Sequence, residues 1–133
     1  MLMPPVSRYM TIAPHAIGPR QPLAAAHRLM RDHRIRHLPV LDGDRLVGIV
    51  SQRDLHLLET LPDVDPESIL VEEAMTDEVF VVSPEAPLDQ VVARMADTKQ
   101  GSVVVMRSDA VVGIFTTIDA LRAFNDVLQR VAD

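Results

Sequence analysis

The sequence predicts a mixed α/β (α+β) fold built from two copies of one small unit, and three observations support this prediction. The chain of 133 residues has the length of one compact domain or of two small domains packed together. It matches itself without a gap at an offset of 65 residues. Each copy alternates helical and strand-like apolar patterns. Because so small a unit is marginal alone, we expect the two copies to pack face to face about a pseudo-two-fold axis.

The repeat extends along most of the chain. We place repeat 1 at 6–60, an acidic linker that contains prolines at 61–70, and repeat 2 at 71–128. The aligned identities include Met10-Thr11 on Met75-Thr76, Pro22-Leu23 on Pro87-Leu88, Val47-Gly48-Ile49 on Val112-Gly113-Ile114, and Asp54 on Asp119.

A helical turn, a brief strand and an amphipathic helix open each repeat. Apolar residues recur at i, i+3, i+4 and i+7 from Leu88, which predicts a helix with one face in the core. Pro22 and Pro87 stand where a first helical turn tolerates proline. The expected turns and strands lie at 6–10 and 15–17 in repeat 1, and at 71–75 and 79–82 in repeat 2.

A strand hairpin and a second helix complete each repeat. Two apolar runs flank Asp42-Gly43, a pair that favours a tight turn. The runs are apolar at successive positions, which predicts strands covered on both faces. Pro39 has no N–H for a sheet ladder, so its strand should be an edge or bulged strand. The runs lie at 38–41 and 46–50, and at 103–106 and 111–115, and the final helices follow Ser51 and Thr116.

The residue composition and the net charge exclude several classes of protein function. The chain has no Cys, which excludes thiol catalysis, disulfides and Cys-based zinc sites and favours a reducing compartment. We expect a cytoplasmic protein without membrane contact, because no secretory signal or membrane-spanning apolar stretch is visible. A net charge of −6 argues against general nucleic-acid binding. Residues 1–65 hold 8 basic and 7 acidic side chains, so RNA binding through this half stays an alternative.

One motif marks the junction between the hairpin and the final helix in both repeats. Gly-Ile-Val-Ser-Gln-Arg-Asp at 48–54 recurs as Gly-Ile-Phe-Thr-Thr-Ile-Asp at 113–119. A structural interpretation makes the hydroxyl residue the N-cap and the aspartate the third helical residue of a capping box. A functional interpretation notes that a helix N-terminus attracts anions and that a carboxylate accepts hydrogen bonds from both hydroxyls of a ribose.

The paired motif resembles a known family. The junctions, the preceding hairpin at 36–50 and the Pro-x-x-Pro-Leu helix starts are together similar to a tandem pair of cystathionine β-synthase (CBS) domains, the Bateman module, over about residues 6–128. The resemblance implies β-α-β-β-α repeats that bind adenosine derivatives in clefts between the repeats. It implies a regulatory module that senses AMP, ADP or ATP, signals by conformational change, forms a homodimer and acts on an effector protein that the sequence does not identify.

The resemblance also implies the residues of two nucleotide sites. The motif aspartates, Asp54 and Asp119, would hold the ribose, and the motif hydroxyls, Ser51 and Thr116, would contact phosphate or ribose. The lining would comprise Ile49 with Thr11 and Ile35 in one repeat, and Ile114 with Thr76 and Phe80 in the other.

The residues before the hairpins differ between the repeats. Repeat 1 has Arg36 and His37 where repeat 2 has Gly101 and Ser102. If Arg36 or His37 contacts phosphate, the two sites are unequal, and that site prefers the more highly phosphorylated ligand. Two acidic sites would instead favour cationic S-adenosylmethionine.

We expect no catalytic residue, no metal site and no required cofactor. His33 and His37 span the expected end of a helix rather than one helical face, so their spacing does not support a metal site. No activated nucleophile or Gly-rich phosphate loop is apparent, which argues against an enzyme. The alternatives are a dimerisation or protein-interaction module without a ligand, an S-adenosylmethionine-binding variant, and a nucleotide-processing enzyme. Leu121, Phe124 and Leu128 on the last helix would pack within the chain or across a dimer.

Overall fold

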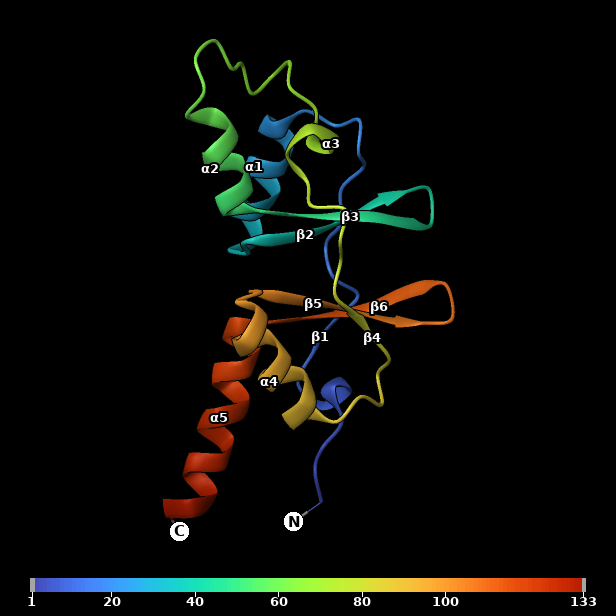
Figure 1. Ribbon diagram of the computed structural model, residues 1–133, viewed down its shortest axis with the longest axis vertical. Coiled ribbons are helices and arrows are strands. Elements are labelled where there is room, and N and C mark those ends of the chain that lie inside the picture. The colour runs from blue at the N-terminus through green and yellow to red at the C-terminus, as the bar shows by residue number, and fades with distance from the viewer. Residues whose placement is uncertain (1, 133) are drawn as a thin grey trace. The chain divides into compact units, whose positions relative to one another are not determined.

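The computed structural model describes residues 2–132 and divides them into two compact units (Figure 1). Unit 1 combines the chain up to Ala13 with the chain from Phe80 onward, and unit 2 holds the segment between them, 14–79. Each unit contains both helices and strands, which confirms the predicted α+β class. Within the described residues, no helix has the length and apolarity needed to cross a membrane.

Unit 2 is built on the hairpin of β2 (His37–Asp42) and β3 (Arg45–Ser51). The helices α1 (Leu23–His33) and α2 (Gln52–Glu59) pack against this hairpin, and Figure 1 shows the two helices side by side. The short helix α3 (Val71–Ala74) also contacts β3.

The hairpin of unit 2 has the turn and the irregularity that its sequence predicts. Gly43 has a φ of 63°, a conformation that glycine adopts without steric cost. The strand register shifts between Val40 and Leu41, one residue beyond Pro39. Strand β5 (Ser102–Arg107) of unit 1 has the same shift between Val105 and Met106 without a proline, so the bulge belongs to the repeat rather than to Pro39. The core beneath the hairpin consists of Ile17, Leu23, Ala26, Met30, Leu38, Val40, Val50, Leu55 and Val71.

Unit 1 contains a four-stranded sheet in the order β1-β6-β5-β4. Strand β4 runs parallel to β5, whereas the other neighbours are antiparallel. The elements of unit 1 are the 3-10 helix η1 (Val6–Arg8), β1 (Thr11–Ile12), β4 (Val81–Val82), α4 (Leu88–Thr98), β5 (Ser102–Arg107), β6 (Ala110–Thr116) and α5 (Thr117–Ala132).

The segments that open the two sequence repeats are exchanged between the compact units. Thr11 pairs with Ile114, so a segment of repeat 1 joins the hairpin of repeat 2. At the same offset, Thr76 of repeat 2 forms a bridge with Ile49 of repeat 1. The sequence predicted three strands per repeat and placed the brief strand of repeat 1 at 15–17, where Ile17 forms a single bridge, rather than at β1. In unit 2 the pairings that correspond to β1–β6 and β4–β5 are single bridges, Ile49 with Thr76 and Ile17 with Val40. The sheet of unit 2 therefore consists of the two strands β2 and β3.

The exchange explains the glycine of the repeated motif. A Cβ built on Gly113 would lie 2.5 Å from the Met10 sulfur and 3.0 Å from the Thr11 carbonyl oxygen. A Cβ on Gly48 would lie 2.6 Å from the Met75 sulfur and 2.9 Å from the Thr76 carbonyl oxygen. The incoming backbone therefore passes each motif glycine too closely for any side chain.

Candidate functional site

The turn from β3 to α2 holds the first predicted motif. Ser51 is the N-cap residue of α2, and its Oγ accepts the N–H of Asp54 at 3.1 Å. Oδ2 of Asp54 in turn accepts the N–H of Ser51 at 2.8 Å. These two bonds form the capping box that the structural interpretation predicts. Oδ1 of Asp54 takes part in neither bond, and the side chain is only partly buried.

The turn from β6 to α5 repeats this geometry with more partners. Oδ2 of Asp119 accepts the Thr116 N–H at 2.9 Å and the Thr116 hydroxyl at 3.2 Å. Oδ1 of Asp119 accepts the Thr11 hydroxyl at 3.4 Å and lies 3.6 Å from the Arg122 guanidinium. Both oxygens of Asp119 thus have protein partners, and the residue is only 4% exposed. The Asp54 carboxylate is the more accessible of the two.

The N–H groups at both helix starts are mostly bonded within the protein. The N–H of Gln52, the first residue of α2, donates to the Arg36 carbonyl at 2.9 Å. The N–H of Thr117, the first residue of α5, donates to the Gly101 carbonyl at 3.0 Å. The third N–H of each helix donates to the N-cap hydroxyl. Little donor capacity remains for an anion at the helix start, so phosphate recognition would fall to side chains.

His37 is one of the two side chains, with Arg36, that distinguish the junction of unit 2 from that of unit 1. It lies opposite Ser51 in the β2–β3 ladder, and paired residues project from the same face of a sheet. Burial lowers the pKa of His37; the Asp54 charge opposes this shift, and the Arg36 charge adds to it. At the equivalent position of unit 1, Ser102 lies opposite Thr116.

The other predicted residues are divided between the two units. Ile35 and Arg36 lie just before β2 in unit 2. In the same unit, Ile49 of β3 and Thr76 exchange two backbone hydrogen bonds of 2.9 and 2.8 Å. The expected grouping placed Thr11 with Ile49 and Thr76 with Ile114. The exchange of the opening segments instead puts Thr11 beside Ile114 in unit 1.

Phe80 lies in the hydrophobic core of unit 1. Its side chain is 5% exposed, and the Arg94 guanidinium lies 3.8 Å from the centre of its ring. Arg122 is a residue of the unit 1 junction that was not predicted from the sequence. The signal for Arg122 was its position three residues after Asp119 on a helix, a spacing that brings side chains together.

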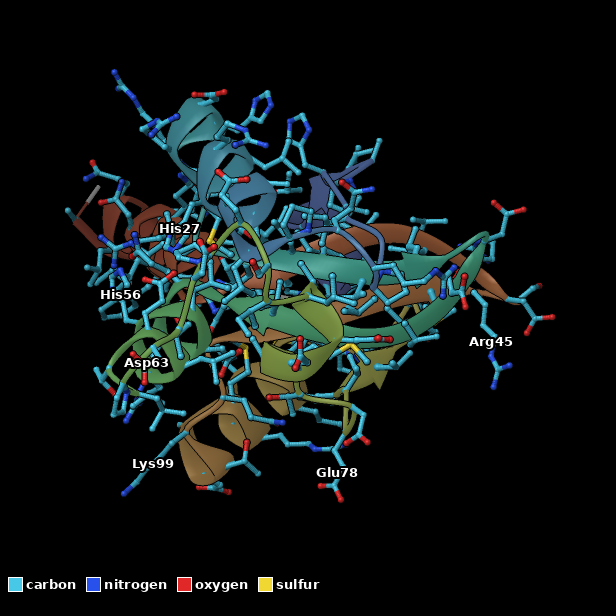
Figure 2. All side chains as sticks on the ribbon, turned by 90° about the horizontal axis from the view of Figure 1, so that it is seen from above. His27, Arg45, His56, Asp63, Glu78 and Lys99 are labelled. Carbon is cyan, nitrogen blue, oxygen red and sulfur yellow. The ribbon has the colours of Figure 1, made fainter. Side chains whose placement is uncertain are left out.

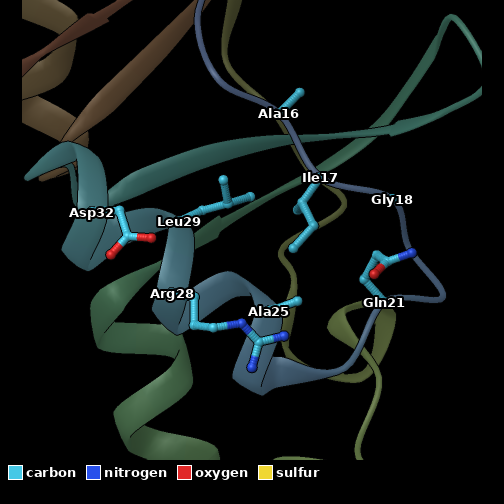
Figure 3. Close-up of a pocket in the computed structure, with 8 residues that line it drawn as sticks. All are labelled: Ala16, Ile17, Gly18, Gln21, Ala25, Arg28, Leu29 and Asp32. Atoms are coloured by element: carbon cyan, nitrogen blue, oxygen red, sulfur yellow. The ribbon is translucent and has the colours of Figure 1, made fainter.

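A hollow of about 480 Å³ lies along α1 in unit 2 (Figure 3). Its apolar lining comes from Ile17, Ala25 and Leu29, and its charged lining comes from Arg28 and Asp32. These side chains belong to α1 and to the segment before it. None of the residues predicted for the nucleotide sites lines this hollow.

A polar cluster joins α1 to α2 within unit 2. His27 on α1 hydrogen-bonds to Glu59 on α2, and the ring of His56 lies 6.1 Å from the His27 ring (Figure 2). Among residues 2–132, no group of three or more His, Asp or Glu side chains is arranged to hold a metal ion. The cluster therefore links the two helices and contains none of the predicted site residues.

Fold and junction together define a tandem α+β module with the same glycine, hydroxyl and carboxylate in each repeat. The family model of the CBS domain matches the chain twice, at residues 6–57 and 71–126. The chain belongs to the CBS domain family, which confirms the resemblance seen in its sequence.

Two curated proteins are similar to this chain in sequence. Over 104 residues the chain is 36% identical to inosine-5'-monophosphate dehydrogenase of Korarchaeum cryptofilum, with 77% of this chain and 21% of that protein covered. It is 30% identical over 107 residues to hypoxic response protein 1 of Mycobacterium tuberculosis, with 80% of this chain and 75% of that protein covered. The chain thus spans about a fifth of the first relative and most of the second.

Solved structures share the fold over nearly the whole chain. A Vibrio cholerae protein assigned to acetoin utilization (AcuB) is 34% identical with a TM-score of 0.86, covering 96% of this chain and 95% of that one. The CBS domain pair of MJ0100, solved with 5'-methylthioadenosine and S-adenosyl-L-methionine, is 26% identical, has a TM-score of 0.82 and covers 94% and 98%. CBSX2, solved with AMP, is 25% identical, has a TM-score of 0.82 and covers 93% and 98%.

Proposed function

We propose that this CBS domain pair is a regulatory module that binds an adenine nucleotide, AMP, ADP or ATP, and that it is not an enzyme. The observation that carries the proposal is the recurrence of one hydroxyl and one carboxylate at the same strand-to-helix junction of both units. A single capping box needs no ligand to explain it. Two copies in a family whose members MJ0100 and CBSX2 were solved with adenosine compounds support a shared ligand chemistry.

The proposed roles follow from the donors and acceptors at each junction. Oδ2 of Asp54 is held by the capping bond, which fixes the direction of the carboxylate and leaves Oδ1 to accept the ribose hydroxyls. A charge-assisted hydrogen bond of this kind contributes about 1.5–3 kcal/mol. Ile35 and Ile49 supply apolar surface for the adenine near this junction in unit 2. In unit 1, Asp119, Thr116, Thr11 and Ile114 take the equivalent roles.

The two proposed sites differ in affinity and in ligand charge. Asp54 is partly exposed, whereas Asp119 is almost fully buried and already accepts hydrogen bonds at both oxygens. A ligand at Asp119 must displace the Thr11 or Arg122 contact, which lowers its net binding energy. In unit 2, Arg36 and His37 would contact the phosphates, so this site prefers ATP over AMP. A neutral or cationic adenosine compound such as S-adenosylmethionine suits unit 1 better.

The regulatory step is a linkage between ligand binding and conformation. A nucleotide shifts the module toward whichever conformation binds it more tightly, by the difference between the two binding free energies. An effector protein that contacts only one conformation then senses the nucleotide. This mechanism requires no bond to be made or broken in the ligand.

We also infer that two copies of the chain pair through α5. Apolar side chains on this helix are 41–77% exposed, while Asp119 and Ala123 are its buried residues. Leu121, Phe124, Leu128 and Val131 are spaced by three, four and three residues, the pattern of a helix-pairing seam. The flanking side chains Ile118, Asn125 and Val127 carry no charge, so a second copy meets no like-charge repulsion. A partner helix would cover apolar surface that this chain leaves exposed.

One preparation tests the nucleotide proposal against its alternatives. Freshly purified protein is denatured, and the released small molecules are identified by mass spectrometry, while thermal unfolding is followed with millimolar AMP, ATP or S-adenosylmethionine. We expect an adenosine compound to be released and the melting temperature to rise with ligand concentration. No released ligand and an unchanged melting temperature with all three compounds would establish a ligand-free interaction module. Product formation from ATP and magnesium would instead indicate an enzyme.

A further inference from the structure

His37 introduces a titratable group at the junction of unit 2, where the junction of unit 1 has Ser102. In unit 2 the capping hydroxyl of Ser51 lies opposite His37, and in unit 1 the capping hydroxyl of Thr116 lies opposite Ser102. The two positions correspond at the offset of 65 that relates the repeats. Any property that arises from the imidazole therefore belongs to the unit 2 site and is absent from the equivalent position of unit 1.

The charges that act on His37 come from two directions. Asp54 acts from the first turn of α2 and favours the protonated imidazole, while Arg36 acts from the residue just before β2 and disfavours it. Burial outweighs the Asp54 charge and holds the pKa of His37 below its ordinary value. The imidazole is therefore mostly neutral at neutral pH in the free protein. The capping bond from the Ser51 N–H holds Oδ2 of Asp54 in place at the start of α2.

A phosphorylated ligand would change this balance. Asp54 would be engaged by the ribose, and the phosphates would add negative charge next to the imidazole, so protonation of His37 becomes more favourable in the complex than in the free protein. A group with a higher pKa in the complex takes up a proton on binding. Adenosine, which has no phosphate, would bring no such charge.

We propose that nucleotide binding at the unit 2 junction is coupled to proton uptake by His37, which makes the affinity of this site for phosphorylated adenosine compounds rise as the pH falls. This inference rests on the proposed function, because it requires a nucleotide at Asp54. Affinity increases as the pH falls through the pKa that His37 has in the complex, and it levels off below the lower pKa of the free protein. The slope is at most about tenfold per pH unit for one proton. The unit 1 site, with Ser102, lacks this dependence.

Calorimetry in buffers of different ionisation enthalpy measures proton uptake directly. ATP is titrated into the full chain near neutral pH in phosphate and in Tris, and the difference in observed heat gives the number of protons bound. We expect a positive fraction of a proton for ATP and none for adenosine in wild-type protein and in Asp119→Asn. In His37→Gln we expect ATP to bind without proton uptake and with a smaller increase in affinity between about pH 8 and about pH 6. Because ATP is the ligand for both wild-type protein and His37→Gln, protonation of its own phosphates contributes equally to both and cancels in the difference between their proton uptakes.

The outcomes separate this inference from the function on which it rests. ATP binding that is weakened by Asp54→Asn but takes up no proton, or takes up the same fraction in His37→Gln, overturns the role of His37 and leaves the nucleotide site standing. An absence of ATP binding, or binding that Asp54→Asn does not weaken, overturns the proposed function itself. The reciprocal variant Ser102→His should add proton uptake to unit 1, measured in an Asp54→Asn background. If proton uptake does not appear there although ATP binds, the imidazole position does not create the coupling.

Discussion

The hydroxyl of Thr11 donates a hydrogen bond to the Asp119 carboxylate at 3.4 Å, although 108 positions separate the two residues in the chain. This contact holds the first strand of the protein against the start of its last helix. It exists because the opening segment of repeat 1 completes the sheet of repeat 2. The carboxylate that we assign to nucleotide binding in unit 1 is therefore positioned by the far end of the sequence.

The close approach of the opening segments makes the motif glycines intolerant of a side chain. Gly48→Ala and Gly113→Ala should each lower the free energy of unfolding by about 1–3 kcal/mol, because the new Cβ would overlap a carbonyl oxygen and a methionine sulfur. Gly18→Ala is the matched control, since its Cβ would meet nothing closer than 3.8 Å. Urea unfolding of the three variants makes the comparison. Equal stability in all three would mean that the segments do not constrain these glycines.

The exchange also predicts which unit loses stability when an opening segment is weakened. Val6 is fully buried in the core of unit 1, and Val71 is fully buried in the core of unit 2. Val6→Ala should speed amide hydrogen exchange in β5 and β6, and Val71→Ala should speed it in β2 and β3, each at a cost of about 1–3 kcal/mol. Mass spectrometry of deuterium uptake locates the change. Faster exchange in β2 and β3 of Val6→Ala would show that the opening segments stay with their own repeats.

Each unit contains an ion pair at the same two repeat positions, and the positions of the positive and negative residues are reversed between the units. Arg20 pairs with Asp42 in unit 2, and at the same offset Glu85 pairs with Arg107 in unit 1. A hydrogen bond from the arginine lowers the pKa of Asp42 and, in the other pair, of Glu85. Any stability from these pairs is thus fully present above the unfolded carboxyl pKa and is lost as the pH falls through the lower folded pKa.

Nuclear magnetic resonance titration of the side-chain carboxyl carbons tests this assignment. Arg20→Gln should return the pKa of Asp42 to its ordinary range and leave that of Glu85 low, and Arg107→Gln should do the reverse. Because both pairs are exposed, we expect little change in stability at neutral pH. An unaltered Asp42 titration in Arg20→Gln would rule out the pair in solution.

The seam on α5 predicts the response of the oligomeric state to a single charge. Leu128→Glu places a carboxylate in the apolar stripe and should convert dimers to monomers, because the charge would be desolvated on pairing. Gln129→Glu introduces the same charge at the next residue, outside the seam, and should leave the dimer intact. Light scattering after size-exclusion chromatography gives the mass of each. A monomeric wild-type protein, or a dimeric Leu128→Glu, contradicts pairing through α5.

Most of the fold was predictable because its signals are local and repeated. The helices after Pro22 and Pro87, both hairpins and the capping boxes at Ser51 and Thr116 follow from periodicity, turn chemistry and capping preferences. Repetition gave the same prediction twice, which strengthened each one. The sequence also located the carboxylates at the junctions.

The sequence did not predict which copy each opening segment joins. Thr11 and Thr76 both follow a methionine at equivalent positions of the repeat, and no local pattern indicates which of the two hairpins each segment joins. Phe80, which the sequence assigned to a site lining, belongs to the core cluster of unit 1, and an aromatic residue beside a strand suits a core and a ligand pocket equally well. Long-range pairing decides both questions.

The central claim, that Asp54 and Asp119 hold the ribose of an adenine nucleotide, is tested most directly by calorimetric titration of AMP and ATP into wild-type protein, Asp54→Asn and Asp119→Asn. Asparagine retains an oxygen for the capping bond and removes the charge, so both variants should stay folded, which their thermal unfolding checks. We expect each variant to lose about ten- to a hundred-fold in affinity at one site and to keep the other. Affinities that are unchanged in both variants would mean that these carboxylates only cap their helices.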